Sequence, residues 1–332
     1  MKIFQILFGL AISLVCGYFA VRGVEWEAVW VAFQKVRVLA LIPALGALAM
    51  MLLVRAYRWQ RFVASLQPVR YAPFLSATLI GFMANDVLPL RAGELIRVYA
   101  LSQLAGVRIS TSLATLVLER VWDTVAVAVL LVVLLLSFPI PVWLTQVALV
   151  MFGGSLLILV GGGVLVRRGE AGLAWLPSRV ANSASHFVRG LATLNNLSSV
   201  LWAFGLSMLI WISLATFYWI LLRACGFVLP VTATLMVTVL TVFAAALPAA
   251  PGYLGTFQYA MVSALSFFAI PKEEALSFSI VAHVGQLLPV IIAGFVELAR
   301  TRLPLWPARH ILEEQEPTPP EKATATVPPT VV

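Results

Sequence analysis

The sequence predicts an all-α protein: a polytopic membrane helical bundle with about six full spans and two broken re-entrant helical hairpins. Three observations support this fold class. Apolar residues make up 61% of the 332-residue chain and charged residues only 11%, with a mean hydropathy of +0.99. Such a composition is incompatible with a water-soluble surface. Six apolar windows are long enough to cross a bilayer, and two further apolar stretches are interrupted by segments rich in Pro and Gly.

The six windows have the length that a transmembrane helix needs, roughly 17 to 25 residues. They cover residues 4–21, 38–54, 111–137, 142–166, 200–222 and 275–299. The first window lacks an Ala-x-Ala-like cleavage site, so we expect an uncleaved helix rather than a signal peptide. We predict a transmembrane domain over residues 1–310. Residues 311–332, rich in Pro, Thr and Glu, are predicted to form a disordered cytoplasmic tail.

Each interrupted stretch predicts two short helices that enter the membrane and return to the same face. Residues 72–84 and 95–107 flank the break LPLRAGELIR, and residues 231–247 and 257–270 flank the break LPAAPGYLGTFQ. At about 1.5 Å per residue, each half covers roughly 15 to 25 Å. Non-helical backbone at membrane depth is tolerated only where protein or water satisfies it. Paired breaks in the two halves of a chain therefore indicate a transport site.

The distribution of Lys and Arg predicts that both termini are cytoplasmic, because short cytoplasmic loops collect positive charge. With re-entrant hairpins, thirteen of these residues fall on the cytoplasmic side and five on the outer side. The cytoplasmic set includes a predicted loop cluster of Arg55, Arg58, Arg61 and Arg70. The first hairpin then enters from the cytoplasm and the second from outside, as in an inverted repeat. The predicted location is the cytoplasmic (inner) membrane.

The first half of the chain concentrates polar side chains at membrane depth, where an ionisable group costs about 2.5 to 3.5 kcal/mol at a helix centre. The candidate substrate-binding residues of this half are Asn85, Asp86, Arg91, Glu94, Arg97, Glu119, Arg120 and Asp123. Their guanidinium groups are suited to phosphate, and the carboxylates would orient the arginines or accept protons. Ion pairs that only lock helices together are the alternative for any one pair.

The second break has no formal charge, so its backbone groups would have to do the binding. Its candidate substrate-binding residues are Pro251, Gly252, Gly255, Thr256 and Gln258. A helix that starts near Gly255 or Thr256 would point free N–H groups and the positive end of its dipole into a cavity. A packing kink is an equal alternative. On the last span we expect His283, three residues before Gln286, to be a packing residue.

Three ordered motifs carry a resemblance to a known family: LPLRAGELIRVYAL, then LERVWD, then PAAPGYLGTFQ. They resemble the membrane domain of lysylphosphatidylglycerol synthases and related stand-alone, flippase-like proteins, over residues 1 to about 310. The family often has Glu where this chain has Gln258. We expect the lipid-handling half without the synthase domain. The resemblance places the family's functional motifs on Asn85, Pro89, Arg91, Gly93, Glu94, Arg97, Glu119, Arg120, Asp123, Pro251, Gly252 and Gly255.

We expect a lipid translocase that moves an anionic or modified phospholipid, or a lipid-linked headgroup, between leaflets. Membrane lipids are its expected partners, with no nucleic acid, cofactor, metal or catalytic residue. The sequence has no GxxxxGK[ST] motif, so transport would be passive or driven by an ion gradient. Two alternatives remain open: a membrane enzyme that uses Glu119 and Asp123 on a lipid-linked phosphate or sugar, and a non-catalytic partner of a lipid-synthesis enzyme. A homo-oligomer also remains open.

Overall fold

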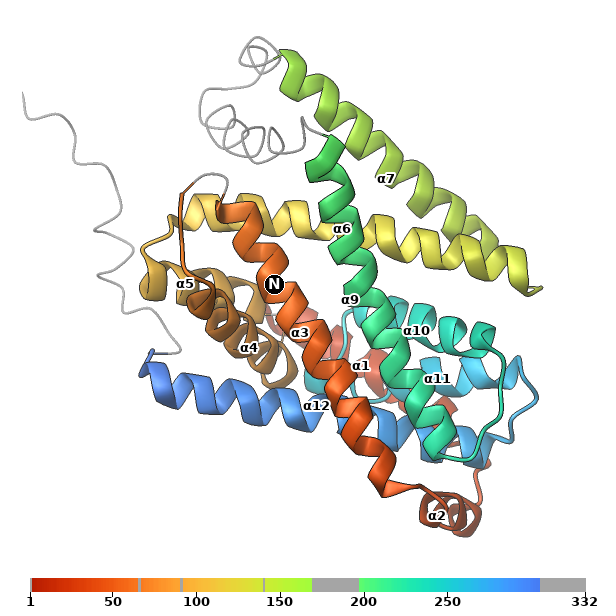
Figure 1. Cartoon of the computed structure of the whole chain (residues 1–332). Helices are drawn as coiled ribbons and strands as arrows, with labels where there is room; N and C mark the ends of the chain where they lie inside the picture. Colours follow the sequence, from red (N-terminus) through yellow and green to blue (C-terminus); the bar gives the residue numbers. More distant parts are fainter. Residues whose placement is uncertain (1, 65–66, 90–91, 140, 169–196, 305–332) are drawn as a thin grey trace, which may run out of the picture.

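The structure is a computed structural model that describes residues 2–64, 67–89, 92–139, 141–168 and 197–304 (Figure 1). Every regular element among these residues is helical, so the all-α prediction is confirmed for this part of the chain. The elements are α1 (Lys2–Val21), α2 (Trp26–Gln34), η1 (Val38–Ala40), α3 (Leu41–Ala64), α4 (Tyr71–Val87), α5 (Gly93–Ala105), α6 (Ile109–Ser137), α7 (Val142–Arg168), α9 (Leu197–Ala224), α10 (Val231–Ala246), η4 (Pro251–Tyr253), α11 (Thr256–Ser266) and α12 (Lys272–Thr301).

Four helices in the described residues are long and apolar enough to cross a membrane. They are Val38–Ala64, Ile109–Ser137, Leu197–Ala224 and Lys272–Thr301. The first predicted window lies in α1, and α1 and α2 form a pair bent by 83° that would make a fifth span if counted as one. The window at 142–166 lies in α7, whose Val142–Gly154 part ranks among the shorter apolar helices. The predicted count of six spans is therefore not confirmed.

Each of the two interrupted stretches forms a pair of short helices that pack against each other, as predicted for the two hairpins. In the first, α4 packs against α5, and Figure 1 shows the two side by side. In the second, α10 packs against α11, with η4 in the connection. Within the first break, residues 90 and 91 lie outside the described residues, as does the predicted tail at 311–332. The four short helices of the two hairpins begin and end within a few residues of the predicted bounds.

Glycine permits the close approach of α4 and α5. A Cβ atom on Gly93 would overlap the carbonyl oxygen of Gly81 and lie 2.6 Å from the backbone nitrogen of Asn85. Both are backbone atoms, so neither can move without shifting α4. Small residues at helix contacts are the usual means of bringing backbones together in membranes. Gly93 thus sets the spacing of the first hairpin.

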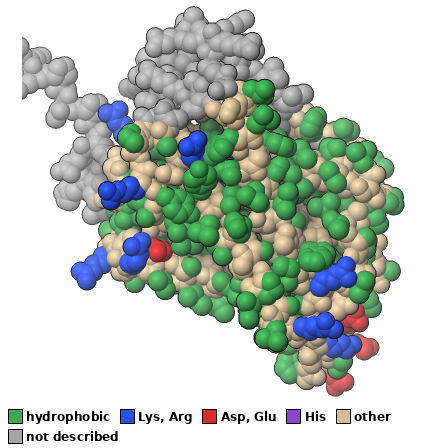
Figure 2. Space-filling view, viewed as in Figure 1, with side chains coloured by type: hydrophobic (Ala, Val, Ile, Leu, Met, Phe, Trp, Pro, Cys, Tyr) green, Lys and Arg blue, Asp and Glu red, His purple; other side chains and the backbone are tan. Residues whose placement is uncertain are grey.

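Apolar side chains cover the outside of the molecule. Leu14, Leu39 and Leu136 leave 73, 82 and 81% of their surfaces exposed. Figure 2 shows a face that is mainly hydrophobic across its middle, with Lys, Arg, Asp and Glu gathered toward its ends. Exposed apolar surface on this scale is expected where lipid, rather than water, surrounds a protein. The fold is therefore that of a membrane protein.

The interior of the bundle joins both hairpins to the long helices. The largest core cluster draws on α3, α6, α9, α10, α11 and α12, and includes Leu48, Leu131, Phe217, Met236 and Phe278. The first hairpin is held from two sides, because α12 and α3 both pack against α4. The second break also packs against the end of α4: a Cβ atom on Gly252 would lie 3.5 Å from the carbonyl oxygen of Asp86. This arrangement places both breaks around one central space.

Replacing Gly93 with Ala should destabilise the protein by about 1 to 3 kcal/mol, because the added methyl group overlaps backbone atoms of α4. Thermal unfolding in detergent measures the change. Gly46→Ala is the matched control, since a Cβ atom there meets open space and alanine favours the helix by about 1 kcal/mol. Equal stability of the two variants would contradict the close contact at Gly93.

Candidate functional site

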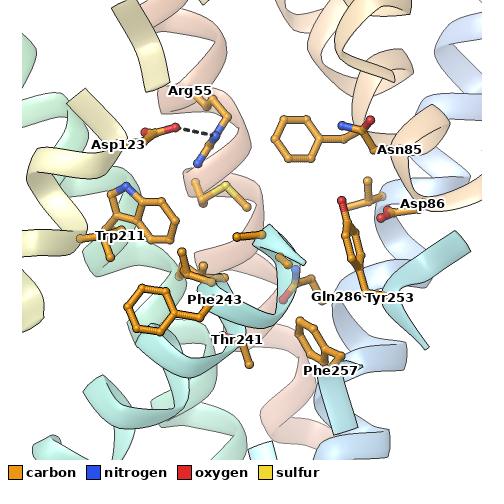
Figure 3. A pocket seen from close by; sticks show the side chains of 18 of the residues that line it. Arg55, Asn85, Asp86, Asp123, Trp211, Thr241, Phe243, Tyr253, Phe257 and Gln286 are labelled. Carbon is orange, nitrogen blue, oxygen red and sulfur yellow. Dashed lines mark hydrogen bonds and ion pairs between the residues drawn. The ribbon is translucent and has the colours of Figure 1, made fainter. Parts of the chain in front are cut away.

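A cavity of about 500 Å³ lies between the two hairpins and the helices α3, α6, α9 and α12 (Figure 3). Its volume is in the range of small-molecule binding pockets, about 300 to 1,000 Å³. The polar and aromatic residues that line it include Arg55, Asn85, Asp86, Glu94, Arg120, Asp123, Trp211, Tyr218, Thr241, Tyr253, Phe257, His283 and Gln286. The cavity therefore combines charged groups with aromatic walls inside an apolar bundle.

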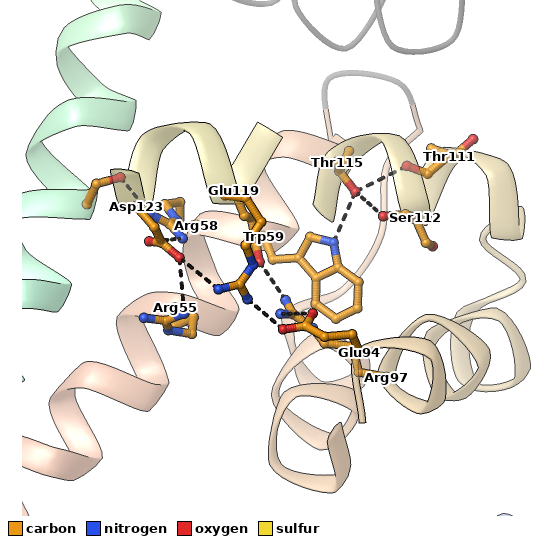
Figure 4. Close-up of polar contacts among 12 residues, drawn as sticks. Arg55, Arg58, Trp59, Glu94, Arg97, Thr111, Ser112, Thr115, Glu119 and Asp123 are labelled. Carbon is orange, nitrogen blue, oxygen red and sulfur yellow. Dashed lines mark hydrogen bonds and ion pairs between the residues drawn. The ribbon is translucent and has the colours of Figure 1, made fainter. Parts of the chain in front are cut away.

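Behind this cavity lies a buried ion pair between α5 and α6. The Nη2 atom of Arg97 donates to Oε2 of Glu119 at 2.8 Å, and both side chains are almost fully buried. The guanidinium of Arg97 also lies 4.0 Å from the ring centroid of Trp59 on α3. Trp59 Nε1 donates in turn to Thr115 Oγ1 at 3.1 Å (Figure 4). Charge pairing and ring stacking thus join α3, α5 and α6.

Glu94 and Arg120 carry this network to the cavity. Glu94 Oε1 accepts a hydrogen bond from Arg120 Nη2 at 2.8 Å, and Glu94 Oε2 lies 3.9 Å from Arg97 Nη1. The Arg120 side chain is 48% exposed, far more than those of Arg97 and Asp123 at 2 and 7%. A ligand can therefore reach Arg120 without displacing the buried pairs.

Asp123 lies close to the middle of the 29-residue helix α6 and contacts three arginines. Its Oδ1 atom is 2.8 Å from Arg58 Nη2, and its Oδ2 atom is 3.3 Å from Arg55 Nη1 and 3.5 Å from Arg120 Nη1 (Figure 4). One carboxylate cannot neutralise three guanidinium groups. With Glu94 on Arg120 and Glu119 on Arg97, the network of four arginines and three carboxylates keeps one guanidinium charge in excess, and two of the arginines around Asp123 line the cavity.

Arg55 is held at the cavity wall by aromatic rings as well as by charge. Its guanidinium carbon lies 5.3 Å from the ring centroid of Phe82 and 5.9 Å from that of Trp211. Its Nε atom is buried and has no hydrogen-bond partner among the described residues. Arg58 lies deeper, with no exposed surface, and donates from Nη1 to Ser207 Oγ at 2.6 Å. Arg58 thus holds Asp123, whereas Arg55 faces the cavity.

The sequence-based assignment of Arg55 and Arg58 to a cytoplasmic loop is wrong. The predicted span ended at residue 54, but α3 continues to Ala64 and buries both arginines. The charges of Arg55 and Arg58 made the apolar window end at residue 54. Inside the bundle both are compensated by ion pairs with Asp123, which lies 68 residues after Arg55 in the chain. The helical period of the segment was a usable signal, since Arg55, Arg58, Trp59 and Phe62 share the buried face.

The predicted residues of the first half fall into three groups. Asn85, Asp86, Glu94, Arg120 and Asp123 line the cavity. Arg97 and Glu119 form the buried pair behind it. Arg91 lies outside the described residues. The structure therefore brings together most of the polar residues that the sequence singled out in this half.

The second break lies beside the cavity and is fixed to α1. Ala250 N–H donates to Ser13 Oγ at 2.7 Å, and a Cβ atom on Gly255 would overlap the carbonyl oxygen of Ser13. Gly252 and Gly255 adopt positive φ values of 67° and 84°, which glycine tolerates best. The predicted residues of this break, Pro251, Gly252, Gly255, Thr256 and Gln258, are not cavity-lining residues, although Tyr253 and Phe257 between them are.

The N-terminus of α11 differs from the expected anion site. The helix begins at Thr256 as predicted, but the N–H of Gly255 donates to Oε1 of Gln258 at 2.7 Å. Gln258 Nε2 also lies 2.8 Å from His283 Nδ1, and the His283 ring stacks on Phe257 with centroids 4.5 Å apart. A side chain of the protein thus uses the N–H group that was expected to be free. His283 packs in the core, as expected, and also lines the cavity.

Comparison with known proteins agrees with this description. The profile of a family described as the lysylphosphatidylglycerol synthase transmembrane region matches residues 6–294. A UPF0104 membrane protein of Methanothermobacter thermautotrophicus is 25% identical over 293 residues, which cover 81% of this chain and 84% of that protein. No solved structure gives a significant match. Every candidate residue of both breaks and of α6 falls inside the matched region.

Replacing Glu119 with Gln should lower the free energy of unfolding by about 3 to 5 kcal/mol, because Arg97 would be left as a buried charge without its closest partner. Thermal and denaturant unfolding in detergent measure the loss. Glu297→Gln is the matched control: its partner Arg300 is 60% exposed, and such a pair contributes about 0 to 1 kcal/mol. A Glu119 variant as stable as this control would show that the buried pair does not hold α5 to α6.

Proposed function

The chain belongs to the lysylphosphatidylglycerol synthase transmembrane-region family, and on that premise we propose that it is a lipid translocase. It moves a phosphate-bearing lipid, an anionic or modified phospholipid or a lipid-linked headgroup, between the leaflets of the cytoplasmic membrane. The headgroup enters the cavity between the hairpins while the acyl chains stay in the bilayer. The observation that carries the proposal is the excess of guanidinium groups around Asp123, at the middle of α6.

Arg55 and Arg120 are the proposed phosphate contacts. Both line the cavity, and both contact Asp123 at more than 3.2 Å, whereas Arg58 contacts it at 2.8 Å. An approaching phosphate therefore competes with these two longer contacts and, at Arg120, also with the 2.8 Å contact to Glu94, while Arg58 keeps Asp123 in place. Guanidinium groups bind phosphate through several directed hydrogen bonds, and the apolar walls strengthen such contacts by excluding water. We place Glu94 and Asp123 as the partners that hold these arginines when the cavity is empty.

We propose transport rather than catalysis. An acid or base needs a carboxyl group that can exchange a proton with a substrate. Glu119 is fully buried in its pair with Arg97, and Asp123 is held by Arg58. Both carboxylates thus stabilise buried arginines, and neither is free for the acid/base work that the enzyme alternative assigned to them.

We also propose that both termini are cytoplasmic. On the predicted six-span topology, removing the buried Arg55 and Arg58 from the thirteen cytoplasmic Lys and Arg residues leaves eleven, against five on the outer side. The excess of Lys and Arg, which orients membrane proteins, therefore remains on the cytoplasmic side. The first hairpin enters from the cytoplasm on this topology and the second from the outer side.

Replacing Arg120 or Arg55 with Ala should reduce lipid movement at least tenfold, because loss of one charge-assisted phosphate contact costs roughly 1.5 to 3 kcal/mol. Reconstituted vesicles that contain a headgroup-labelled phosphatidylglycerol, with quenching of the outer leaflet, measure the rate. Arg61→Ala is the matched control, since Arg61 lies on the same helix as Arg55 but is exposed and stacks on Trp202. Movement at the wild-type rate in both cavity variants would overturn the assignment.

A further inference from the structure

Asp86 differs from the other acidic residues of the cavity in having no cationic partner. Glu94 and Asp123 each lie 2.8 Å from a guanidinium group. Among the described residues, no Lys, Arg or His forms an ion pair with Asp86. Asp86 is partly buried and lines the cavity. A carboxylate removed from water without a partner is costly, and a positive charge beside it would stabilise its ionised form.

The position of Asp86 in α4 adds to this preference. α4 ends at Val87, so Asp86 lies in the last turn, where the helix dipole is negative. A carboxylate at this end raises the negative potential further. The neighbouring Asn85 also lines the cavity, and its Oδ1 atom is buried without a hydrogen-bond partner among the described residues. The Asn85 oxygen packs against Gly93 of α5, so the Asp86 carboxylate is the oxygen that the end of α4 offers to a cation in the cavity.

Tyr253 brings an aromatic ring to the same part of the cavity. Figure 3 shows Tyr253 next to Asp86, with Phe257 close by. Tyr253 is one of three non-glycine residues with positive φ in the described part of the chain, at 57°. Such a backbone conformation costs free energy in a non-glycine residue and occurs at turns and at functional sites. Aromatic rings attract ammonium groups through their π faces, so the ring and the carboxylate favour the same kind of ligand.

We propose that Asp86 and Tyr253 form a subsite for a positively charged group, on the opposite side of the cavity from the phosphate contact at Arg55. In Figure 3, Arg55 and Asp123 lie on one side of the cavity and Asp86 and Tyr253 on the other. The cavity thus presents a positive and a negative region to one ligand. This inference rests on the proposed function and narrows its substrate. The bound cation is either the ammonium group of a headgroup that also carries the phosphate, or a small monovalent cation bound with the lipid.

Binding to the purified protein in detergent tests the subsite without requiring transport. The probes are short-chain phosphatidylethanolamine and short-chain phosphatidylglycerol, which share the phosphate and differ in the ammonium group. We expect the wild type to prefer the ethanolamine lipid and Asp86→Asn to lose roughly 10- to 100-fold in affinity for it, the range expected for one contact to a charged group. Asp86→Glu should keep the preference. Glu27→Gln, on the exposed surface of α2, should bind as the wild type does.

The outcomes separate the two sources of positive charge. A loss in Asp86→Asn confined to phosphatidylethanolamine assigns the subsite to a headgroup ammonium. An equal loss for both lipids, together with loss of a sodium-dependent increase in wild-type affinity, assigns it to a small cation. Unchanged affinity for both lipids, with or without sodium, would overturn the subsite.

The same proteins in vesicles test the proposed function separately. If the wild type binds phosphatidylethanolamine in an Asp86-dependent way but moves neither lipid between leaflets, the translocase proposal fails and the subsite stands. If it moves both lipids at rates that Asp86→Asn does not change, and binding is unchanged as well, the subsite fails and the translocase proposal stands.

Discussion

Compensation of buried charge is the constraint on which the first half of the structure depends. Four arginines and three carboxylates from α3, α5 and α6 form one connected network inside an apolar bundle. Each buried charge is tolerated only because a partner from another element reaches it. The pairs therefore fix the relative position of three helices, and the cavity forms where this network meets apolar walls. The shape and the electrostatic field of the cavity thus have the same origin.

The two hairpins contribute to the cavity in different ways. The first places charged and amide side chains on the lining, and it is held together by the close contact of Gly81 with Gly93. The second supplies aromatic side chains to the lining. Its own polar groups bond within the hairpin, as the Gly255 N–H does with Gln258. Two pairs of short helices therefore frame a chemically asymmetric space. This asymmetry is suited to a ligand whose two ends differ in charge.

Features that depend on short stretches of sequence, the helices and the polar lining residues, were predictable. Hydropathy and the Pro/Gly breaks predicted both hairpins within a few residues, and polar residues in apolar context predicted the cavity lining at Asn85, Glu94 and Asp123. Pairing between distant elements was not predictable. Arg55 resembled a loop residue because its partner is 68 residues away, and the capping role of Gln258 depends on the geometry of a turn that only the fold defines.

The attachment of α1 to the second break has a consequence for biogenesis. Ser13 accepts its hydrogen bond from Ala250, 237 residues later, and Lys272 Nζ donates to the carbonyl oxygens of Phe19 and Arg22. Chains are synthesised from the N-terminus, so α1 obtains these partners only after the residues between Ser13 and Ala250 have been made. The exposed apolar side chains of α1 can face lipid until then. A late step of assembly therefore joins α1 to the second break.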